Sequence, residues 1–416
     1  MHSPLPKVVH PVCGRAMIAH VLEAVKGLSP GKTVLVVGVG REAVEEAAGD
    51  FETLTAVQDS PRGTGDAARA GLAALGEASG DVLVLPGDTP LLTAEVLRAL
   101  TETHARQGHD ATVLTFTPPD PGSYGRVIRN EDGSVSRIVE ARDAGEPERS
   151  VREVNSGIYC FRSEALFEAL PRIGAGNAAS EYYLTEVVEL MERGSVGAVA
   201  ASDPAAVLGI NTPEQLAEAS RLMEGRILAS LLAGGVSVPA PDRIWVEWGV
   251  EVGENTTLLP FSVLRRGVKV GRGCTVGPFA HLRGGTVVRD GAWVGSFVEA
   301  NRSEVGEGSA AGHLAYLGDA RIGRGATVGA GAVTANFDGK EKHGTIIEDG
   351  AMIGAGTVLV APVRVGSGAT TGAGAVVTGR TNVPPGDVVV GVPARSRRTR
   401  TGPEPPPSPR EEGKEP

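Results

Sequence analysis

An apolar residue recurs at every sixth position over much of the C-terminal half of the chain. A six-residue period fits neither an α-helix nor a β-hairpin, but it is the period of the hexapeptide repeats of a parallel β-helix. Glycine follows many of these residues and permits tight corners. We therefore predict a left-handed parallel β-helix from about residue 245 on. The two series are Val252, Leu258, Leu264, Val270, Val276, Leu282, Val288, Val294 and then Ile347, Ile353, Leu359, Val365, Thr371, Val377.

The first 210 residues follow a different pattern, in which short apolar runs alternate with helical periodicity. KTVLVVG (32–38) and DVLVLPGD (81–88) are typical of buried parallel strands. AARAGLAAL (67–75) and TAEVLRALTETHARQG (93–108) predict helices between them. This alternation is typical of an open, Rossmann-like α/β sheet, which binds ligands at the carboxyl ends of its strands, where Asp88 stands.

A helix is predicted over 212–233, with Thr212 as its N-cap, Pro213 at its first position and Gln215 completing a capping box. Residues 402–416 are rich in proline and charge and predict disorder, and RSRRTR (395–400) is interpreted as solvated. The predicted domains are therefore 1–211 (α/β), 212–235 (linker helix), 236–397 (β-helix) and 398–416 (disordered tail).

Composition narrows the classes of function. The 416 residues carry a net charge of −10, which argues against non-specific nucleic-acid binding but leaves room for a small anionic substrate. Three widely spaced cysteines suggest neither a disulfide framework nor a CxxC metal site, which fits a reducing cytoplasm. No signal peptide and no apolar run of about 18 residues is recognised, so membrane insertion is not expected.

GHLAYLGDA (312–320) interrupts the six-residue period and brings a histidine, a tyrosine and an aspartate together. A break in a regular coil is a place where a cleft can open. A histidine there is suited to general-base catalysis, because its ordinary pKa lies near neutral pH. Taken alone, His313 would more often be a satisfied histidine on a coil corner.

The order of the parts, together with a set of motifs, resembles the bifunctional N-acetylglucosamine-1-phosphate uridylyltransferase / glucosamine-1-phosphate N-acetyltransferase family. The resemblance extends from residue 5 to residue 395. The motifs are LPKV (5–8), QDSPRGTGDA (58–67), LPGDTPLL (85–92), SYGRV (123–127), IVEARDA (138–144), EVNSGIY (153–159), EYYLT (181–185), GIN (209–211), GPFAHLRGG (277–285), GHLAYLGDA and ANFDG (335–339).

For the C-terminal domain, the resemblance implies acetylation of glucosamine-1-phosphate from acetyl-CoA, with His313 as the base. It places Arg283, Tyr316 and Lys342 around the sugar phosphate, where an arginine can bind two oxygens at once. The site for the sugar phosphate and acetyl-CoA is expected to comprise Arg283, Asn301, Tyr316, Thr327, Asn336, Phe337, Lys342, Ala355 and Ala373.

Two positions depart from the family pattern. Asn301 replaces a common lysine, and Arg302 next to it is expected to point to the opposite face of the strand. Phe337 replaces a tyrosine. A zinc site built from His281, His313 and His343 is a weaker alternative, because a three-histidine site needs convergent geometry.

For the N-terminal domain, the resemblance implies uridylyl transfer from UTP to N-acetylglucosamine-1-phosphate with release of pyrophosphate. It implies Mg²⁺ bound by Asp88 and Asn211, the style expected of a hard cation with few protein oxygens. The nucleotide and UDP-N-acetylglucosamine are expected to contact Lys7, Gln58, Gly63, Thr64, Gly125, Glu140, Asn155 and Asn211.

The family begins with a strand and a glycine-rich loop before LPKV, and this chain has Met1 there. We expect unpaired strand edges and weak uridylyl transfer from the chain as written, with a late start codon favoured as the cause. GVGREA (38–43) also matches a dinucleotide-binding pattern, but alone that signal is weak.

The resemblance further implies a homotrimer with acetyl-CoA sites between chains. Two alternatives stay open: a related sugar-phosphate nucleotidyltransferase with a regulatory β-helix or another acyl acceptor, and a non-enzymatic solenoid scaffold.

Overall fold

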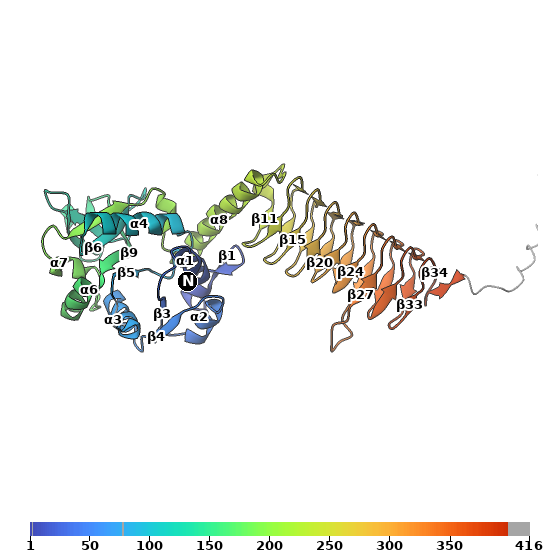
Figure 1. Cartoon of the computed structure of the whole chain (residues 1–416), viewed down its shortest axis with the longest axis horizontal. Helices are drawn as coiled ribbons and strands as arrows, with labels where there is room; N and C mark the ends of the chain where they lie inside the picture. The colour runs from blue at the N-terminus through green and yellow to red at the C-terminus, as the bar shows by residue number, and fades with distance from the viewer. Residues whose placement is uncertain (2, 77–78, 398–416) are drawn as a thin grey trace, which may run out of the picture. The chain divides into compact units, whose positions relative to one another are not determined.

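The computed structural model describes residues 1, 3–76 and 79–397, and the predicted tail, 398–416, lies outside them. The chain forms two compact units, Met1–Met223 and a second that begins at Glu224 (Figure 1). The boundary falls within helix α8 (Pro213–Ala233), so the finer division with a separate linker helix stays a prediction.

The larger sheet of the N-terminal unit has six strands. Five of them follow the order β10-β6-β9-β7-β8, and β5 pairs with β9. The strands are β5 (Asp81–Val84), β6 (Ala111–Phe116), β7 (Arg126–Arg129), β8 (Val135–Val139), β9 (Val154–Arg162) and β10 (Val196–Ala200). Two short strands, β1 (Pro11–Val12) and β2 (Arg15–Ala16), form a separate hairpin.

A second sheet holds β3 (Val34–Val37) and β4 (Leu54–Val57), which pair in parallel as predicted for residues 32–38. The prediction of a parallel strand at 81–88 is wrong in its direction of pairing. β5 runs antiparallel to β9, because the long buried strand β9 lies between β5 and β6 and runs opposite to both. Among the described residues, five strands of these two sheets pair along one edge only, namely β3, β4, β5, β8 and β10.

Helices cover both faces of the larger sheet. Leu97 and Leu100 of α4 pack with Leu114 and Ile158 on one face. On the other face, α3, α6 and α7 pack against the alternate residues of β6 and β9, such as Val113. The helices of this unit are α1 (Met17–Lys26), α2 (Arg41–Ala47), α3 (Thr64–Leu75), α4 (Ala94–Gln107), α5 (Glu146–Arg149), α6 (Ser163–Ala169) and α7 (Glu186–Leu190).

Helix α8 begins with the predicted capping box. Thr212 Oγ1 accepts a hydrogen bond from Gln215 N at 3.2 Å, and Gln215 Oε1 accepts one from Thr212 N at 3.1 Å. These two bonds satisfy N–H groups that have no partner within a helix. Among the described residues, no helix has both the length and the apolar character needed to cross a lipid bilayer.

The second unit is a parallel β-helix whose coils stack one on another (Figure 1). Its first face consists of β11 (Trp245–Val246), β14 (Val263–Leu264), β17 (His281–Leu282), β20 (Glu299–Asn301), β23 (Tyr316–Gly318), β26 (Val333–Ala335), β29 (Val358–Val360) and β32 (Val376–Val377). Its second face consists of β12 (Glu251–Val252), β15 (Lys269–Val270), β18 (Val287–Val288), β21 (Glu304–Val305), β24 (Ala320–Ile322), β27 (Thr345–Ile347), β30 (Val363–Val365) and β33 (Asn382–Val383). Its third face consists of β13 (Thr257–Leu258), β16 (Thr275–Val276), β19 (Trp293–Ser296), β22 (Ala310–His313), β25 (Thr327–Val328), β28 (Met352–Ile353), β31 (Thr370–Thr371), β34 (Val388–Val390) and β35 (Arg395–Ser396).

The interruption of the six-residue period has a structural counterpart in the length of the coils. Val270 pairs with Val288, 18 residues later, whereas Val305 pairs with Ile322, 17 residues later. Ile322 pairs with Ile347, 25 residues later, and the added residues form a loop after β26. The irregular coils therefore lie where GHLAYLGDA and ANFDG stand.

Candidate functional sites

Three polar residues that are far apart in the sequence meet in the N-terminal unit. Lys7 Nζ donates a hydrogen bond to the Asp88 carboxylate and another to Asn211 Oδ1 at 2.8 Å. The Asp88 side chain is mostly buried, with 16% exposed, whereas Lys7 is 38% exposed. The two oxygens converge on one point, which is the arrangement needed for two ligands of a single cation.

Hydrogen bonds of the backbone hold Asp88 and Asn211 close together. Asp88 follows β5, and its carbonyl oxygen accepts a hydrogen bond from Ile210 N at 3.0 Å. Gln215 Oε1 accepts a hydrogen bond from Asn211 N at 2.7 Å, so the capping box of α8 also holds Asn211. Lys7 belongs to a short 3₁₀ turn, Lys7–Val9.

The predicted nucleotide residues gather at the start of α3. Gln58 Nε2 donates to the Gly63 carbonyl at 3.3 Å and to Asp66 at 2.8 Å, and this bond lowers the pKa of Asp66. Gly63 has φ of +111°, and a Cβ atom there would lie 2.5 Å from the Tyr182 carbonyl oxygen. Only glycine fits this close approach. Thr64 Oγ1 accepts a hydrogen bond from Leu184 N at 3.0 Å.

The predicted sugar contacts form a second, more buried group. The Gly125 carbonyl accepts a hydrogen bond from Asn155 N at 2.8 Å, and a Cβ atom at Gly125 would lie 3.5 Å from Glu140 Oε2. Burial raises the pKa of Glu140, whose Oε1 accepts from Thr185 at 3.1 Å. Asn155 Nδ2 donates to the Tyr159 hydroxyl at 2.6 Å. The structure therefore brings these three predicted residues together.

In the β-helix, a polar cluster centres on Asp319, at the end of the first face. Arg302 donates two hydrogen bonds to its carboxylate, at 2.7 and 2.8 Å, and the Asn336 amide donates a third. The hydrogen bond from Arg302 is the main cause of the lowered pKa of Asp319, to which the charge of Lys342 also contributes. A Cβ atom at Gly318 would lie 2.6 Å from Asn336 Nδ2 and 2.8 Å from the Tyr316 ring. Tyr316 and Asn336 therefore flank the same glycine.

The expectation that Arg302 continues the strand of Asn301 is wrong. β20 ends at Asn301, and Arg302 has φ of +49°, so the alternation of a regular strand stops before it. Its guanidinium turns to Asp319 and borders a surface hollow of about 320 Å³ that Asp319 and Arg321 also line. Sequence reasoning gave no role to Asp319, although it stands inside the GHLAYLGDA motif.

His313 lies on a different face. It ends β22 on the third face and is exposed, with the Trp293 ring edge-on at 5.5 Å between centroids. Asn301, Tyr316 and the cluster around Asp319 belong to the first face and its far corner. Within one chain, the predicted acetyl-transfer residues therefore lie on two different faces of the β-helix.

The other predicted residues of this domain are also divided. Arg283 follows β17 on the first face and donates to Glu299 at 3.1 Å, and Asn301 is 7% exposed at the end of β20. Phe337 begins the loop after β26 and is 59% exposed. Thr327 lies on the third face, and Ala355 and Ala373 lie at exposed corners that follow it.

Each of the two units matches a known protein family. Residues 1–177 match the MobA-like NTP transferase domain. Residues 249–284 and 344–379 match the bacterial transferase hexapeptide family, in blocks of six repeats. The unmatched stretch between the two blocks contains the irregular coils described above.

Curated relatives cover nearly the whole chain. A bifunctional protein GlmU of Thermobifida fusca is 41% identical, over 97% of this chain and 91% of the relative. Proteins of the same name from Streptomyces coelicolor (41% identity, 94% and 89% covered) and Geobacillus thermodenitrificans (39% identity, 87% and 86% covered) are similar. The chain therefore belongs to the GlmU family of bifunctional transferases, which combine glucosamine-1-phosphate acetyltransferase and N-acetylglucosamine-1-phosphate uridylyltransferase activities in UDP-N-acetylglucosamine synthesis.

Proposed function

We propose that uridylyl transfer takes place at the cluster of Lys7, Asp88 and Asn211, with Mg²⁺ bound by Asp88 and Asn211. The observation that carries this proposal is the convergence of both side-chain oxygens on one Lys7 Nζ. Magnesium commonly takes one or two protein oxygens and completes its octahedron with water and substrate phosphates. When bound, it neutralises charge on the phosphates of UTP, and Lys7 adds a second positive charge beside them.

The reaction joins the phosphate oxygen of N-acetylglucosamine-1-phosphate to the α-phosphorus of UTP and releases pyrophosphate. We assign the uridine end to Gln58, Gly63 and Thr64, where backbone and amide groups are held for contact with a flat base. The sugar is assigned to the group of Gly125, Glu140 and Asn155, whose buried polar atoms suit sugar hydroxyl and amide groups.

For acetyl transfer, we assign the general base to His313. The amine of glucosamine-1-phosphate loses a proton to the imidazole as its nitrogen attacks the thioester carbonyl of acetyl-CoA, and the thiol of coenzyme A leaves. Support comes from the exposure of His313 at the end of a shortened coil and from the edge contact of Trp293, which limits the ring's orientations.

The sugar phosphate is assigned to Arg283, Tyr316 and Lys342, with Asn336 held by Asp319. Arg302, joined to the same carboxylate, supplies a positive charge near the position where Asn301 replaces lysine. The backbone of the exposed Phe337 forms a β-bridge with Lys342. Thr327, Ala355 and Ala373, on the third face and the corner after it, are assigned to acetyl-CoA.

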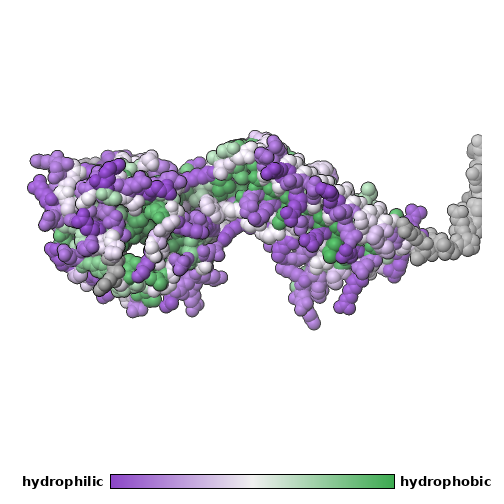
Figure 2. All heavy atoms as spheres, viewed as in Figure 1, coloured by the Kyte–Doolittle hydropathy of each residue, from purple (hydrophilic) through white to green (hydrophobic). Residues whose placement is uncertain are grey.

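We further propose a homotrimer, and a row of exposed apolar residues supports it. Phe261, Phe279, Phe297 and Leu314 occupy the same corner of successive coils, and the phenylalanine rings stack with centroids 4.9 Å apart. We call this row the aromatic ladder. Each member is more than 40% exposed (Figure 2 shows apolar residues reaching the surface of this unit). Each also has φ between +51° and +62°, a conformation that costs a non-glycine residue about 1 kcal/mol or more.

Later coils place glycine at this corner: Gly331, Gly356 and Gly374 continue the row. Glycine adopts a positive φ without strain, so the bulky apolar side chains of the ladder are the costly choice. Burial against a second copy of the chain offsets that cost. Leu314 directly follows His313, so a second copy of the chain that packs on the ladder would also approach the proposed base. That copy could supply the acetyl-transfer residues that lie on a different face from His313 within one chain.

The ladder can be tested by sedimentation equilibrium of Phe279→Ser, with Phe167→Ser as the matched control because Phe167 is an exposed phenylalanine in the other unit. We expect Phe279→Ser to dissociate into monomers that retain uridylyl transfer and lose acetyl transfer. A Phe279→Ser protein with the mass and acetyl transfer of the wild type would contradict the interface.

The magnesium proposal is tested by pyrophosphate release from UTP and N-acetylglucosamine-1-phosphate. Release should require Mg²⁺ and stop on chelation. Pyrophosphate release that is unaffected by chelation would reject the magnesium proposal.

We also propose a cytoplasmic location, since the cysteines Cys13, Cys160 and Cys274 are buried thiols, as expected in a reducing compartment.

A further inference from the structure

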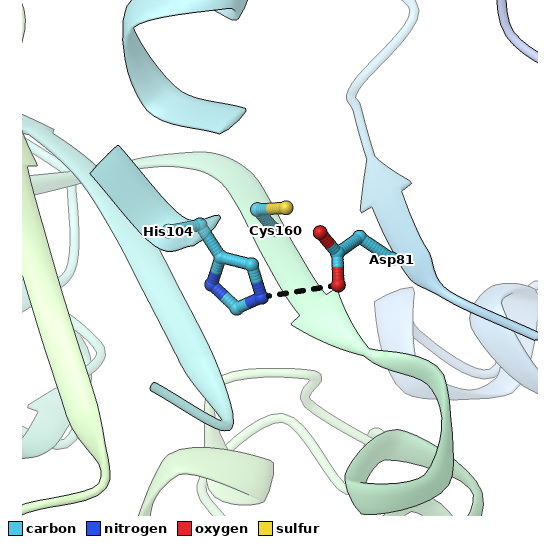
Figure 3. Close-up of side chains that lie close together, drawn as sticks. All are labelled: Asp81, His104 and Cys160. Atoms are coloured by element: carbon cyan, nitrogen blue, oxygen red, sulfur yellow. Dashed lines mark ion pairs between the residues drawn. The ribbon is translucent and has the colours of Figure 1, made fainter. Parts of the chain in front are cut away.

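One group of potential soft-metal ligands stands apart from both proposed sites. Asp81, His104 and Cys160 come from three elements, the start of β5, helix α4 and the middle of β9 (Figure 3). A carboxylate oxygen, a ring nitrogen and the sulfur all lie within 4.8 Å of one another. Asp81 is at the opposite end of β5 from Asp88, so this group does not belong to the uridylyl site.

The distances suit a tetrahedral ion. His104 Nε2 lies 3.5 Å from Asp81 Oδ1, longer than an ordinary N–H···O hydrogen bond. Two ligands, each about 2.1 Å from a tetrahedral zinc ion, lie about 3.4 Å apart. The carboxylate and the imidazole are therefore already spaced as neighbouring ligands, and the Cys160 sulfur lies within 4.8 Å of both.

A hydrogen bond at the second ring nitrogen fixes the orientation of the His104 imidazole. His104 Nδ1 forms a 2.8 Å hydrogen bond with Thr112 Oγ1, a fully buried hydroxyl on β6. Metal-binding histidines are typically fixed in this way by a partner on the other ring nitrogen, which directs the free lone pair at the ion. When Nδ1–H donates to Thr112, Nε2 presents its lone pair to Asp81 and Cys160.

We propose that Asp81, His104 and Cys160 bind a soft or borderline divalent cation such as Zn²⁺ or Co²⁺, with water as a fourth ligand. A thiolate, an imidazole and a carboxylate favour such ions over Mg²⁺. The ionised sulfur and carboxylate together balance a charge of +2. His104 and Cys160 are buried, and Asp81, 44% exposed, gives the ion access from solvent.

Binding should release one proton, because the thiol must ionise to form the metal–sulfur bond. Burial raises the pKa of Cys160 to about 12 and lowers that of His104, so near neutral pH the metal-free site holds a thiol and a neutral imidazole.

The test is a Co²⁺ titration of the whole chain with Mg²⁺ in excess, followed by absorption spectroscopy. We expect a thiolate-to-cobalt charge-transfer band in the near ultraviolet and the visible bands of tetrahedral cobalt. Cys160→Ser should abolish the charge-transfer band, whereas Cys274→Ser, at a buried cysteine of the β-helix, should leave it unchanged. Cobalt at Asp88 cannot produce this band, because no thiol belongs to that cluster.

A second variant guards against misfolding of Cys160→Ser. Asp81→Ser alters the exposed ligand only and should weaken Co²⁺ binding by about tenfold or more with the far-ultraviolet circular dichroism unchanged. No charge-transfer band at millimolar Co²⁺, or a band that persists in Cys160→Ser, would overturn the proposal. In that case the group is a loose Asp81–His104 ion pair beside an apolar cysteine.

Discussion

The two proposed active sites are built in opposite ways. In the N-terminal unit, Lys7, Asp88 and Asn211 are separated by up to 204 residues, yet one ammonium group bonds to both of the others. In the β-helix, His313 and Tyr316 are three positions apart, yet they lie on different faces. Proximity in sequence is therefore a poor guide to assembly of a site in this molecule.

The difference follows from architecture. An open α/β sheet ends all its strands at an edge where loops from distant segments meet, so a site can be complete within one unit. A β-helix repeats side chains in straight rows along convex faces, and its interior is filled by small aliphatic residues. A cleft therefore needs irregular coils and, in our proposal, a second copy of the chain. Variants that affect one activity and spare the other test this comparison.

The largest effect is expected for His313→Ala. Loss of a general base should lower kcat for acetyl transfer by about 10²–10⁴-fold. Pyrophosphate release from UTP should be unchanged, because none of the residues assigned to uridylyl transfer belongs to the β-helix. Thiol release from acetyl-CoA measures the first activity and coupled pyrophosphate detection the second. Acetyl transfer at the wild-type rate would reject His313 as the base.

The converse variant is Asp88→Asn. Replacing a charged magnesium ligand with a neutral amide should lower uridylyl transfer by about 10²-fold, since a bound metal contributes several kcal/mol to such a transition state. Higher Mg²⁺ should restore part of the rate, and acetyl transfer should be unchanged. A parallel loss of both activities would show that the two sites are coupled, which contradicts the comparison.

Much of the fold follows from local signals. Helix α4 and the capping box of α8 lie where their cap residues and periodicity predict, and the six-residue period identifies the β-helix. The strand at 81–88 was predicted to pair in parallel, whereas β5 pairs antiparallel with β9, because strand partners depend on contacts distant in sequence. Asp81, His104 and Cys160 gave no signal at all, since no regular spacing relates them. The contact of Arg302 with Asp319 was missed because the positive φ of Arg302 ends the alternation of the strand at Asn301.

An intermediate effect is expected for Asp319→Ala, which leaves Arg302 and Asn336 without their shared acceptor. KM for glucosamine-1-phosphate should rise by about tenfold, the effect of losing charge-assisted hydrogen bonds, with little change in kcat. Asp290→Ala is the matched control, because Asp290 accepts a backbone hydrogen bond at another corner of the β-helix. Equal effects of both variants on KM would show a purely structural role.

The Asp319→Ala variant should also change how the free energy of unfolding depends on pH. The pKa of Asp319 is lowered from 3.8, chiefly by the hydrogen bond from Arg302. A carboxyl group with a lowered pKa stabilises the fold above its unfolded-state pKa, and this stabilisation is lost as pH falls through the lower, folded-state value. The difference in unfolding free energy between wild type and Asp319→Ala should therefore be constant from pH 7 to pH 5 and shrink below 3.8. Urea unfolding at each pH measures it.

The smallest effect is expected for Gln215→Ala, which tests how a helix cap serves the N-terminal site. Gln215 Oε1 accepts hydrogen bonds from the backbone N–H groups of Asn211 and Thr212, so its loss should loosen the magnesium ligand Asn211 without removing it. We expect KM for Mg²⁺ in uridylyl transfer to rise about threefold, equivalent to less than 1 kcal/mol, with kcat nearly unchanged.

The matched control is Glu218→Ala, on the same helix, where Glu218 accepts two hydrogen bonds from Arg221. Gln215→Glu should restore the wild-type KM, because a carboxylate at this position accepts the same two hydrogen bonds. Both α8 variants remove an exposed polar side chain, but only Gln215 contacts the segment that carries Asn211. If Gln215→Ala and Glu218→Ala raise KM for Mg²⁺ equally, the cap stabilises the helix alone, and Asn211 is held instead by the bond between Ile210 N and the Asp88 carbonyl.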